Sequence, residues 1–294
     1  MRKQTKLVAV LSTAALLAIG ASMTSFAATG WAEEDGTWVY YNRDGERATD
    51  QWKKSGNNWY WLNSDGEMAI DQLIEDGDNY YYVDINGVMA ANQWVAIDNE
   101  DAGQDNEPDH YWYYFQANGK ALKNSGDNVS LKTINGKKYE FDQYGAMTAE
   151  WSLDVEAAST NGTRDGYSTS ATNSVSAKYA EQWRYFNSVE DGSRVSKGWF
   201  KVVAAEYLNY EKYNDDEDAW YYADGSGNLY AGEFKTIKGK KYAFRNDGRM
   251  VDGLKFINDT GSGLSVIADD DDTYPFDDED RFDENAPKLN KLGY

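Results

Sequence analysis

Residues 30–92 read GWAEEDGTWVYYNRDGERATD, QWKKSGNNWYWLNSDGEMAID and QLIEDGDNYYYVDINGVMAAN, three successive stretches of 21 residues with the same residue types at the same places. Three positions carry the repeat: Trp31, Trp52, Leu73 and Trp94 share the first, Trp38, Trp59 and Tyr80 the second, and Gly45, Gly66 and Gly87 the third. A repeat of this length is typical of a unit that cannot bury its apolar face alone and stacks on copies of itself. The sequence therefore predicts a tandem array, with its function in the surfaces that recur.

Each copy has the residue pattern of a β-hairpin. In the first copy, residues 38–41 form a run of strand-favouring side chains, residues 42–45 supply a turn that ends in Asp-Gly, and residues 46–49 return. An Asp-Gly or Asn-Gly pair accepts the positive φ angles of a tight turn. Such a pair follows the aromatic cluster in most copies, so the sequence predicts a row of hairpins.

The strand residues explain why the copies must touch one another. Alternation places Trp38 and Tyr40 on one face of the strand and Val39 and Tyr41 on the other, so both faces are apolar. Ordering one copy costs roughly 20 to 40 kcal/mol of backbone entropy, whereas burying one aromatic side chain returns about 1.5 to 3 kcal/mol. An isolated copy is therefore not expected to be stable, and each should bury its strand against its neighbours.

Later copies keep the aromatic clusters but lengthen the connections between them. Copy four carries an acidic insertion at 98–109, and copy six a Ser/Thr/Ala-rich insertion at 154–181, while a ninth copy opens at 253 and does not close. We therefore divide the chain into a segment at 1–27, regular copies at 28–124, divergent copies with insertions at 125–253, and an incomplete copy with an acidic tail at 254–294.

The first 27 residues have the features of a cleaved export signal. Arg2, Lys3 and Lys6 precede an apolar run at residues 7–19, and Ser25-Phe26-Ala27 places small residues where a signal peptidase reads them. A membrane anchor is the alternative, but the run is shorter than the roughly 20 apolar residues that span a bilayer. We therefore predict a secreted chain that begins near Ala28 and does not stay inserted in the membrane.

Composition excludes several classes of function. The net charge of −21 argues against binding nucleic acid or anionic lipid through charge. The chain has no cysteine and a single histidine, His110, which excludes Cys/His zinc sites and cysteine nucleophiles. No catalytic residue, metal ligand or cofactor is predicted. The acidic runs lack the spacing of a twelve-residue calcium loop, so we expect them to be solvated insertions.

The motifs Gly30-Trp31, Trp38-Val39-Tyr40-Tyr41 and Asp44-Gly45 resemble the cell wall-binding repeat family. That family includes choline-binding and glucan-binding repeats of Gram-positive surface proteins. The resemblance covers residues 30–253 and implies an all-β fold, a β-solenoid of tandem stacked hairpins, several of them with long inserted loops. It also implies attachment at the cell surface to choline-bearing teichoic acid or a wall polysaccharide, through aromatic pockets between successive copies.

Carried onto this chain, the resemblance implies two aromatic cages. Trp31, Trp38 and Trp59 would form the first, and Trp52, Trp59 and Tyr80 the second, with Met68 as lining. A trimethylammonium group donates no hydrogen bond, so aromatic faces must bind it, each contributing about 0.5 to 2 kcal/mol. Sugar rings would use the same aromatic faces as platforms, so choline and glucan both stay open as ligands.

The repeat pattern weakens in some copies. Leu73 replaces the leading tryptophan of copy three, so no cage is expected at the third seam. Copies five and eight carry Lys-Lys-Tyr clusters at 137–139 and 240–242 without a leading tryptophan, and are expected to be spacers or sugar-binding repeats.

Three alternatives to a wall-binding protein of this length stay open. A glycosidase would need paired carboxylates held in a separate domain, and every long stretch of this chain is either repeat or insertion. The chain could be the binding part of a wall hydrolase whose catalytic part lies beyond Tyr294. It could also be an adhesin whose inserted loops, above all 154–181, contact a protein partner.

Overall fold

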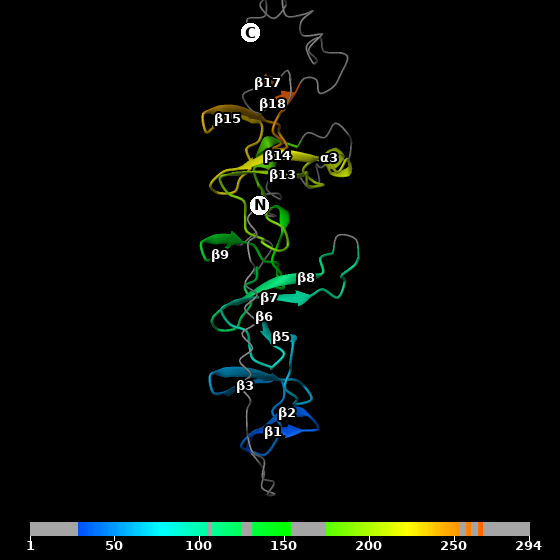
Figure 1. Cartoon of the computed structure of the whole chain (residues 1–294), viewed down its shortest axis with the longest axis vertical. Helices are drawn as coiled ribbons and strands as arrows, with labels where there is room; N and C mark the ends of the chain where they lie inside the picture. Colours follow the sequence, from blue (N-terminus) through cyan, green and yellow to red (C-terminus); the bar gives the residue numbers. More distant parts are fainter. Residues whose placement is uncertain are drawn as a thin grey trace, which may run out of the picture. The chain divides into compact units, whose positions relative to one another are not determined.

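The computed structural model describes residues 29–104, 107–124, 131–153, 175–252, 257–259 and 264–266. Two-stranded antiparallel hairpins follow one another along the chain (Figure 1). The pairs are β1 (Gly30–Glu34) with β2 (Thr37–Tyr41), β3 (Gln51–Ser55) with β4 (Asn58–Leu62), β5 (Gln72–Asp76) with β6 (Asn79–Val83), β7 (Gln93–Asp98) with β8 (His110–Phe115), β9 (Lys132–Ile134) with β10 (Lys137–Tyr139), β11 (Glu150–Leu153) with β12 (Trp183–Phe186), β13 (Gly198–Val203) with β14 (Asp218–Ala223), β15 (Glu233–Ile237) with β16 (Lys240–Phe244), and β17 (Ile257–Asp259) with β18 (Leu264–Val266). The predicted fold class, an all-β array of tandem hairpins, is confirmed.

The hairpin of each copy uses a different turn from the one predicted. In copy one, β1 pairs with β2 across the two-residue turn Asp35-Gly36, whose φ angles are 50° and 82°. The predicted return after residues 42–45 makes only one bridge, between Tyr41 and Arg47, so the assignment of the main hairpin to that turn is wrong. A two-residue turn with positive φ at both positions matches the twist of the strands and closes a longer ladder. The first strand of this hairpin is therefore the segment Gly30–Glu34, which the sequence analysis did not assign as a strand.

Consecutive copies are joined through the backbone of this return segment. In copy two, the Met68 N–H donates to the Trp38 carbonyl of copy one over 2.8 Å, and in copy three the Met89 N–H donates to the Trp59 carbonyl over 2.9 Å. Each of these return segments is thus hydrogen-bonded to the second residue of the preceding copy's second strand. Because backbone groups buried between copies need partners, this bond fixes where one hairpin sits on the next.

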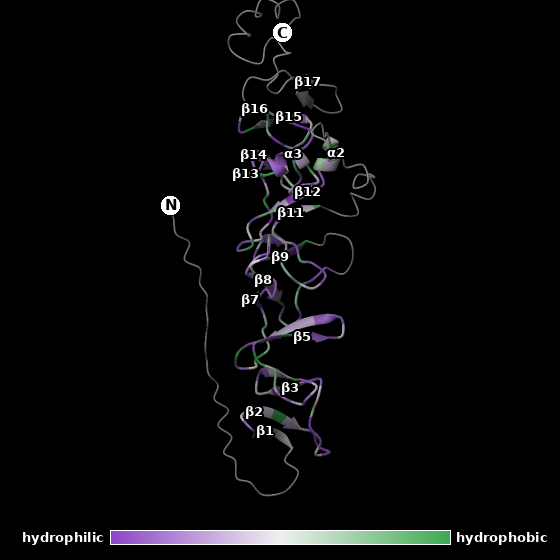
Figure 2. Ribbon diagram, turned by 90° about the vertical axis from the view of Figure 1, so that its right-hand side faces the viewer, coloured by the Kyte–Doolittle hydropathy of each residue, from purple (hydrophilic) through white to green (hydrophobic). Residues whose placement is uncertain are grey.

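The described residues divide into two compact units. The first contains residues 29–95 and 114–121, and the second contains 96–113 and the described residues from 122 onward. Hydrophobic residues occur in short separate runs along the described chain (Figure 2), so no single hairpin holds a large core. In the first unit, Trp61, Ile74 and Tyr81 pack in one buried cluster. In the second unit, a larger buried cluster contains Tyr179, Ala180, Trp183, Phe200, Ala205, Leu208, Tyr221, Ala223, Leu229 and Ala231.

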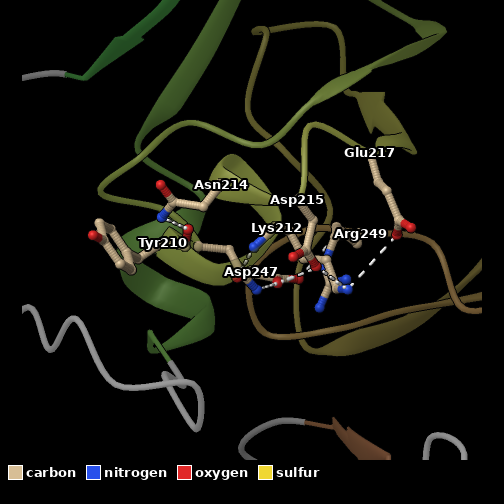
Figure 3. Close-up of polar contacts among 8 residues, drawn as sticks. Tyr210, Lys212, Asn214, Asp215, Glu217, Asp247 and Arg249 are labelled. Atoms are coloured by element: carbon tan, nitrogen blue, oxygen red, sulfur yellow. Dashed lines mark hydrogen bonds and ion pairs between the residues drawn. The ribbon is translucent and has the colours of Figure 1, made fainter.

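Among the described residues of the insertions of copies six and seven lie two short helices, and the sequence did not indicate either. They are α2 (Ala177–Ala180) and α3 (Tyr210–Asn214). Asn209 caps α3 by accepting the Lys212 N–H over 3.0 Å, and its own amide donates to Asp247 Oδ2 over 2.6 Å. Asp247 also accepts a hydrogen bond from Arg249 Nε over 2.7 Å (Figure 3). This network joins the insertion of copy seven to the turn of copy eight.

The structure describes part of copy nine but not the predicted export signal. Copy nine, predicted not to close, contributes β17 and β18, which pair from Ile257 with Val266 to Asp259 with Leu264. The predicted export signal at 1–27, most of the insertion at 154–181 and the acidic tail after 266 lie outside the described residues. Neither helix in the described part of the chain has the length and hydropathy needed to cross a bilayer.

Replacing Gly87 by alanine is expected to destabilise the first unit by about 1 to 3 kcal/mol. Gly87 has a φ of 74°, and an added Cβ would lie 2.9 Å from Met68 Cε and 3.1 Å from the Ala69 carbonyl oxygen. Gly77 is the matched control, because its φ is 60° but an added Cβ would meet nothing within 4 Å. Denaturant unfolding of both variants checks this. An equal loss in both would show that the contact of Met68 with the turn contributes nothing.

Candidate functional site: the aromatic seams

The leading tryptophans lie between aromatic residues of two successive copies. The Trp31 ring centre is 5.4 Å from that of Tyr40 in its own hairpin and 5.3 Å from that of Tyr60 in the next, both in edge-on geometry. Trp52 has equivalent neighbours: its ring centre is 5.2 Å from that of Trp61 in edge-on geometry, and 5.0 Å from that of Tyr81 in tilted geometry. Edge-to-face pairs of this kind stabilise packing beyond the area that they bury. Trp31 and Trp52 therefore hold neighbouring hairpins together.

A second set of contacts pairs a tryptophan with a methionine of the following copy. In four places of the described chain a methionine N–H donates to the carbonyl of a tryptophan in the second strand of the preceding copy. We call these the Trp–Met seams: Trp38–Met68 at 2.8 Å, Trp59–Met89 at 2.9 Å, Trp112–Met147 at 2.8 Å and Trp220–Met250 at 2.7 Å. Methionine is flexible and polarisable, and packs favourably at aromatic edges. Each seam thus joins the backbone of a tryptophan to that of a methionine in the following copy, and at one of them Trp112 and Met147 line the same cavity.

The tryptophans of the seams differ in exposure. Trp59 is 41% exposed and Trp220 is 43% exposed, which is unusual for so large an apolar side chain. The Lys54 ammonium lies 5.8 Å from the Trp59 ring centre, within the distance at which a cation is attracted to an aromatic face. The exposed indole of Trp59 already attracts a cation of the protein itself.

The structure distributes the six predicted site residues over several seams. The Met68 N–H donates to the Trp38 carbonyl at the first seam, whereas the sequence analysis grouped Trp38 with Trp31 and Trp59 and gave Met68 as lining. Trp59 lies at the second seam beside Met89, which the sequence analysis did not single out. At the third seam the Tyr80 carbonyl accepts the N–H of Ala121, so alanine replaces methionine there. Whether these residues bind a ligand stays a prediction.

The remaining two predicted residues, Trp31 and Trp52, have a different setting. Their ring contacts among the described residues are to tyrosine or tryptophan of the hairpin pair. The Trp52 indole N–H also donates to Asp76 Oδ2 over 3.2 Å. Both side chains are partly buried, so they have less free surface than Trp59.

An aromatic cluster of the predicted composition occurs in copies seven and eight, where no cage was predicted. The Trp199 ring centre is 6.3 Å from that of Trp220 and 4.8 Å from that of Tyr242. Trp199 is the leading tryptophan of copy seven, and Trp220 is the first aromatic residue of the second strand of that copy. Tyr242 belongs to the following copy. The Gly198-Trp199 pair was the sequence signal for this cluster. Copy eight lacks a leading tryptophan of its own but completes the cluster of copy seven.

A cavity of about 290 Å³ lies at the Trp112–Met147 seam. Its lining includes His110, Trp112, Asp142, Met147 and Glu150. His110 Nε2 lies 3.0 Å from Glu190 Oε1, and the His110 ring meets the Trp112 ring edge-on with centres 5.6 Å apart. The single histidine of the chain is therefore positioned in a seam. Among the described residues, no group of acidic and histidine side chains is arranged to hold a metal ion.

Beside this cavity, Tyr111 donates a hydrogen bond to Glu107 Oε2 over 2.6 Å, which raises the pKa of Tyr111 to about 12. Burial adds to this rise, since it disfavours the phenolate. The contribution of Tyr111 to stability is therefore fully present below pH 10, the ordinary pKa, and is lost as the pH rises through about 12. In a titration followed by the ultraviolet absorbance of phenolate, Glu107→Gln should move the titration of one tyrosine to lower pH. An unchanged curve would contradict the hydrogen bond.

Comparison with known proteins agrees with the repeat pattern. Residues 48–94 match the profile of the choline-binding repeat. Glucosyltransferase-S of Streptococcus mutans serotype c is 27% identical over 173 residues, which cover 49% of this chain and 11% of that enzyme. The chain thus spans about a tenth of the length of this curated relative.

Solved structures of Streptococcus pneumoniae proteins also show similarity. The modular autolysin LytC, in complex with a synthetic peptidoglycan ligand, matches 81% of this chain and 42% of its own, with 18% identity and a TM-score of 0.47. Choline binding protein F matches 76% of this chain and 58% of its own, with 24% identity and a TM-score of 0.46. The choline-binding domain of CbpL matches 82% of this chain and all of its own, with 19% identity and a TM-score of 0.44.

The tandem hairpins and the aromatic clusters between them define a repeat-built binding module. Residues 48–94, which contain copies two and three with the Trp59–Met89 seam, match the choline-binding repeat. The resemblance stated from the sequence is thereby confirmed for copies two and three.

Proposed function

We propose that this protein is a non-catalytic attachment protein of a Gram-positive cell surface, which binds choline-bearing teichoic acid through its Trp–Met seams. The observation that carries the proposal is the recurrence of one junction, a tryptophan carbonyl bonded to a methionine N–H, at four places. Two of the four indoles are more than 40% exposed. Repetition of a partly exposed indole beside methionine suits a ligand that is itself repeated along a polymer.

Cation–π attraction accounts for the choice of choline. Each aromatic face contributes about 0.5 to 2 kcal/mol, so one seam alone binds weakly. Several seams on one polymer raise avidity by about 10² to 10⁴. The net charge of −21 favours a cationic ligand further and disfavours a bare polyphosphate.

Glucan binding is a second candidate function. The similarity to a segment of glucosyltransferase-S favours it, because the aromatic residues that would bind choline also suit the apolar faces of sugar rings. Under either function the chain could be the binding part of a longer wall hydrolase, or an adhesin whose insertions contact a protein.

Retention on a choline-substituted resin tests the proposal. The mature chain should bind and should elute with free choline, and dextran should not elute it. A folded chain that passes through the choline resin but binds dextran would overturn the choline assignment and support glucan.

A further inference from the structure

The cavity at the Trp112–Met147 seam differs in its chemistry from an aromatic cage. Trp112 supplies a flat indole face, but the other walls include the carboxylates Asp142 and Glu150 and the hydroxyl of Thr148. None of the lining residues is a lysine or an arginine. A trimethylammonium group cannot donate a hydrogen bond, so it would form none with these acceptors. The lining instead suits a cation that also donates hydrogen bonds.

The two carboxylates are available to a ligand. Asp142 uses Oδ1 to accept the backbone N–H groups of Tyr144 and Ala146, each over 2.8 Å, and this holds the side chain in place. Within the described part of the chain, neither Asp142 Oδ2 nor the Glu150 carboxylate has a hydrogen-bond partner. A carboxylate without a partner at the wall of a cavity favours a cation there.

The backbone conformation of Glu150 follows from the repeat. Its φ is 59°, and the equivalent residues Asp50, Asp71, Asn92 and Lys197 have φ angles between 46° and 53°. In each of them the backbone N–H donates to the carbonyl of the residue that follows the second strand. The repeat therefore determines where Glu150 lies, at the wall of the cavity.

Glu190 is near the cavity but does not line it. His110 Nε2 and Glu190 Oε1 lie 3.0 Å apart, and Asp142 and Glu150 are the acidic residues of the lining. The volume of about 290 Å³ is at the lower end of the about 300 to 1,000 Å³ typical of small-molecule sites. One sugar unit suits such a space better than a chain of several.

We propose that the Trp112 cavity is a second type of ligand site, which binds a hexosamine with a free protonated amine. The apolar face of the sugar ring would stack on Trp112, and the ammonium group would donate to Glu150 and Asp142. This inference assigns the Trp112–Met147 seam to a hexosamine and leaves the other three Trp–Met seams to the choline of the proposed function, so either proposal can fail alone.

Methionine methyl NMR gives the sharpest test, because the chain has six methionines and four of them form the seams. Glucosamine added to the ¹³C-methyl-labelled mature chain should shift the Met147 signal saturably and leave Met68, Met89 and Met250 unchanged. N-acetylglucosamine, which keeps the ring but loses the charge, should bind at least about tenfold more weakly. The Glu150→Gln substitution should weaken the binding of glucosamine by a similar factor.

Three results would overturn the inference. Equal binding of N-acetylglucosamine would show that the cavity recognises the sugar ring and not the protonated amine. A choline-induced shift of Met147 equal to that of Met89 would make the cavity an ordinary seam. Absence of any Met147 shift with glucosamine would leave the cavity without this ligand. Because N-acetylglucosamine varies the ligand instead of the protein, the test stands even if the Glu150→Gln variant does not fold.

Discussion

Replacing Trp38 and Trp59 together by alanine should weaken retention on choline resin by about a hundredfold, since it removes the indole faces of two seams. The loss should come from binding and not from unfolding, because Trp59 is 41% exposed and its removal leaves no large cavity. The choline concentration that elutes the variant measures the effect.

The control for this variant is Tyr144→Ala. Tyr144 is 56% exposed but lies in the turn of copy five, outside the Trp–Met seams. Its replacement should leave retention unchanged. Equal losses in the two variants, or unchanged retention of the Trp38/Trp59 variant with intact hairpins, would contradict a role for the seams.

Replacing Asp247 by alanine should destabilise the second unit by about 3 to 5 kcal/mol, the cost of leaving a buried charge without its partner. The Asp247 side chain is 7% exposed and that of Arg249 is 16% exposed. The change removes the acceptor for both Arg249 and the Asn209 amide, so α3 also loses its attachment. Asp247→Asn keeps an acceptor oxygen and should recover part of the loss.

Asp215 provides the matched control in the same region. Its carboxylate lies 2.7 Å from the Lys212 ammonium, but its side chain is 41% exposed (Figure 3). Exposed ion pairs contribute about 0 to 1 kcal/mol, so Asp215→Ala should change stability by no more than that. Denaturant unfolding of the two variants compares them. A loss at Asp247 no larger than at Asp215 would show that the buried network does not stabilise the unit.

The regular spacing of aromatic residues and glycines was sufficient to predict the tandem hairpins. It was not sufficient to assign the strands, because Gly30–Glu34 is short and only its pairing with Thr37–Tyr41 identifies it as a strand. The positive φ of Gly87 was predictable from the Asn-Gly pair, whereas its approach to Met68 depends on how one copy sits on the next. Local patterns determine the hairpin, and the contact between copies determines its environment.

The site shows the same division. Trp38, Trp59 and Met68 could be chosen from the repeat, since they recur at fixed positions. The role of Met89 and the cavity at Trp112 could not be predicted from the repeat. The cavity brings residues 108–112 together with 142–150 and Val189 across inserted loops. Likewise, Asn209 and Asp247 are 38 residues apart, and no period relates them. Contacts made through insertions fall outside a repeat analysis.

The most direct test of the central claim is a choline titration of the mature chain, followed through the methyl signals of Met68 and Met89. The Trp–Met seams predict saturable shifts of both signals, and loss of the Met89 shift in Trp59→Ala while the Met68 shift remains. If choline binds the folded chain without moving either methyl signal, the ligand lies elsewhere and the seams only join the hairpins.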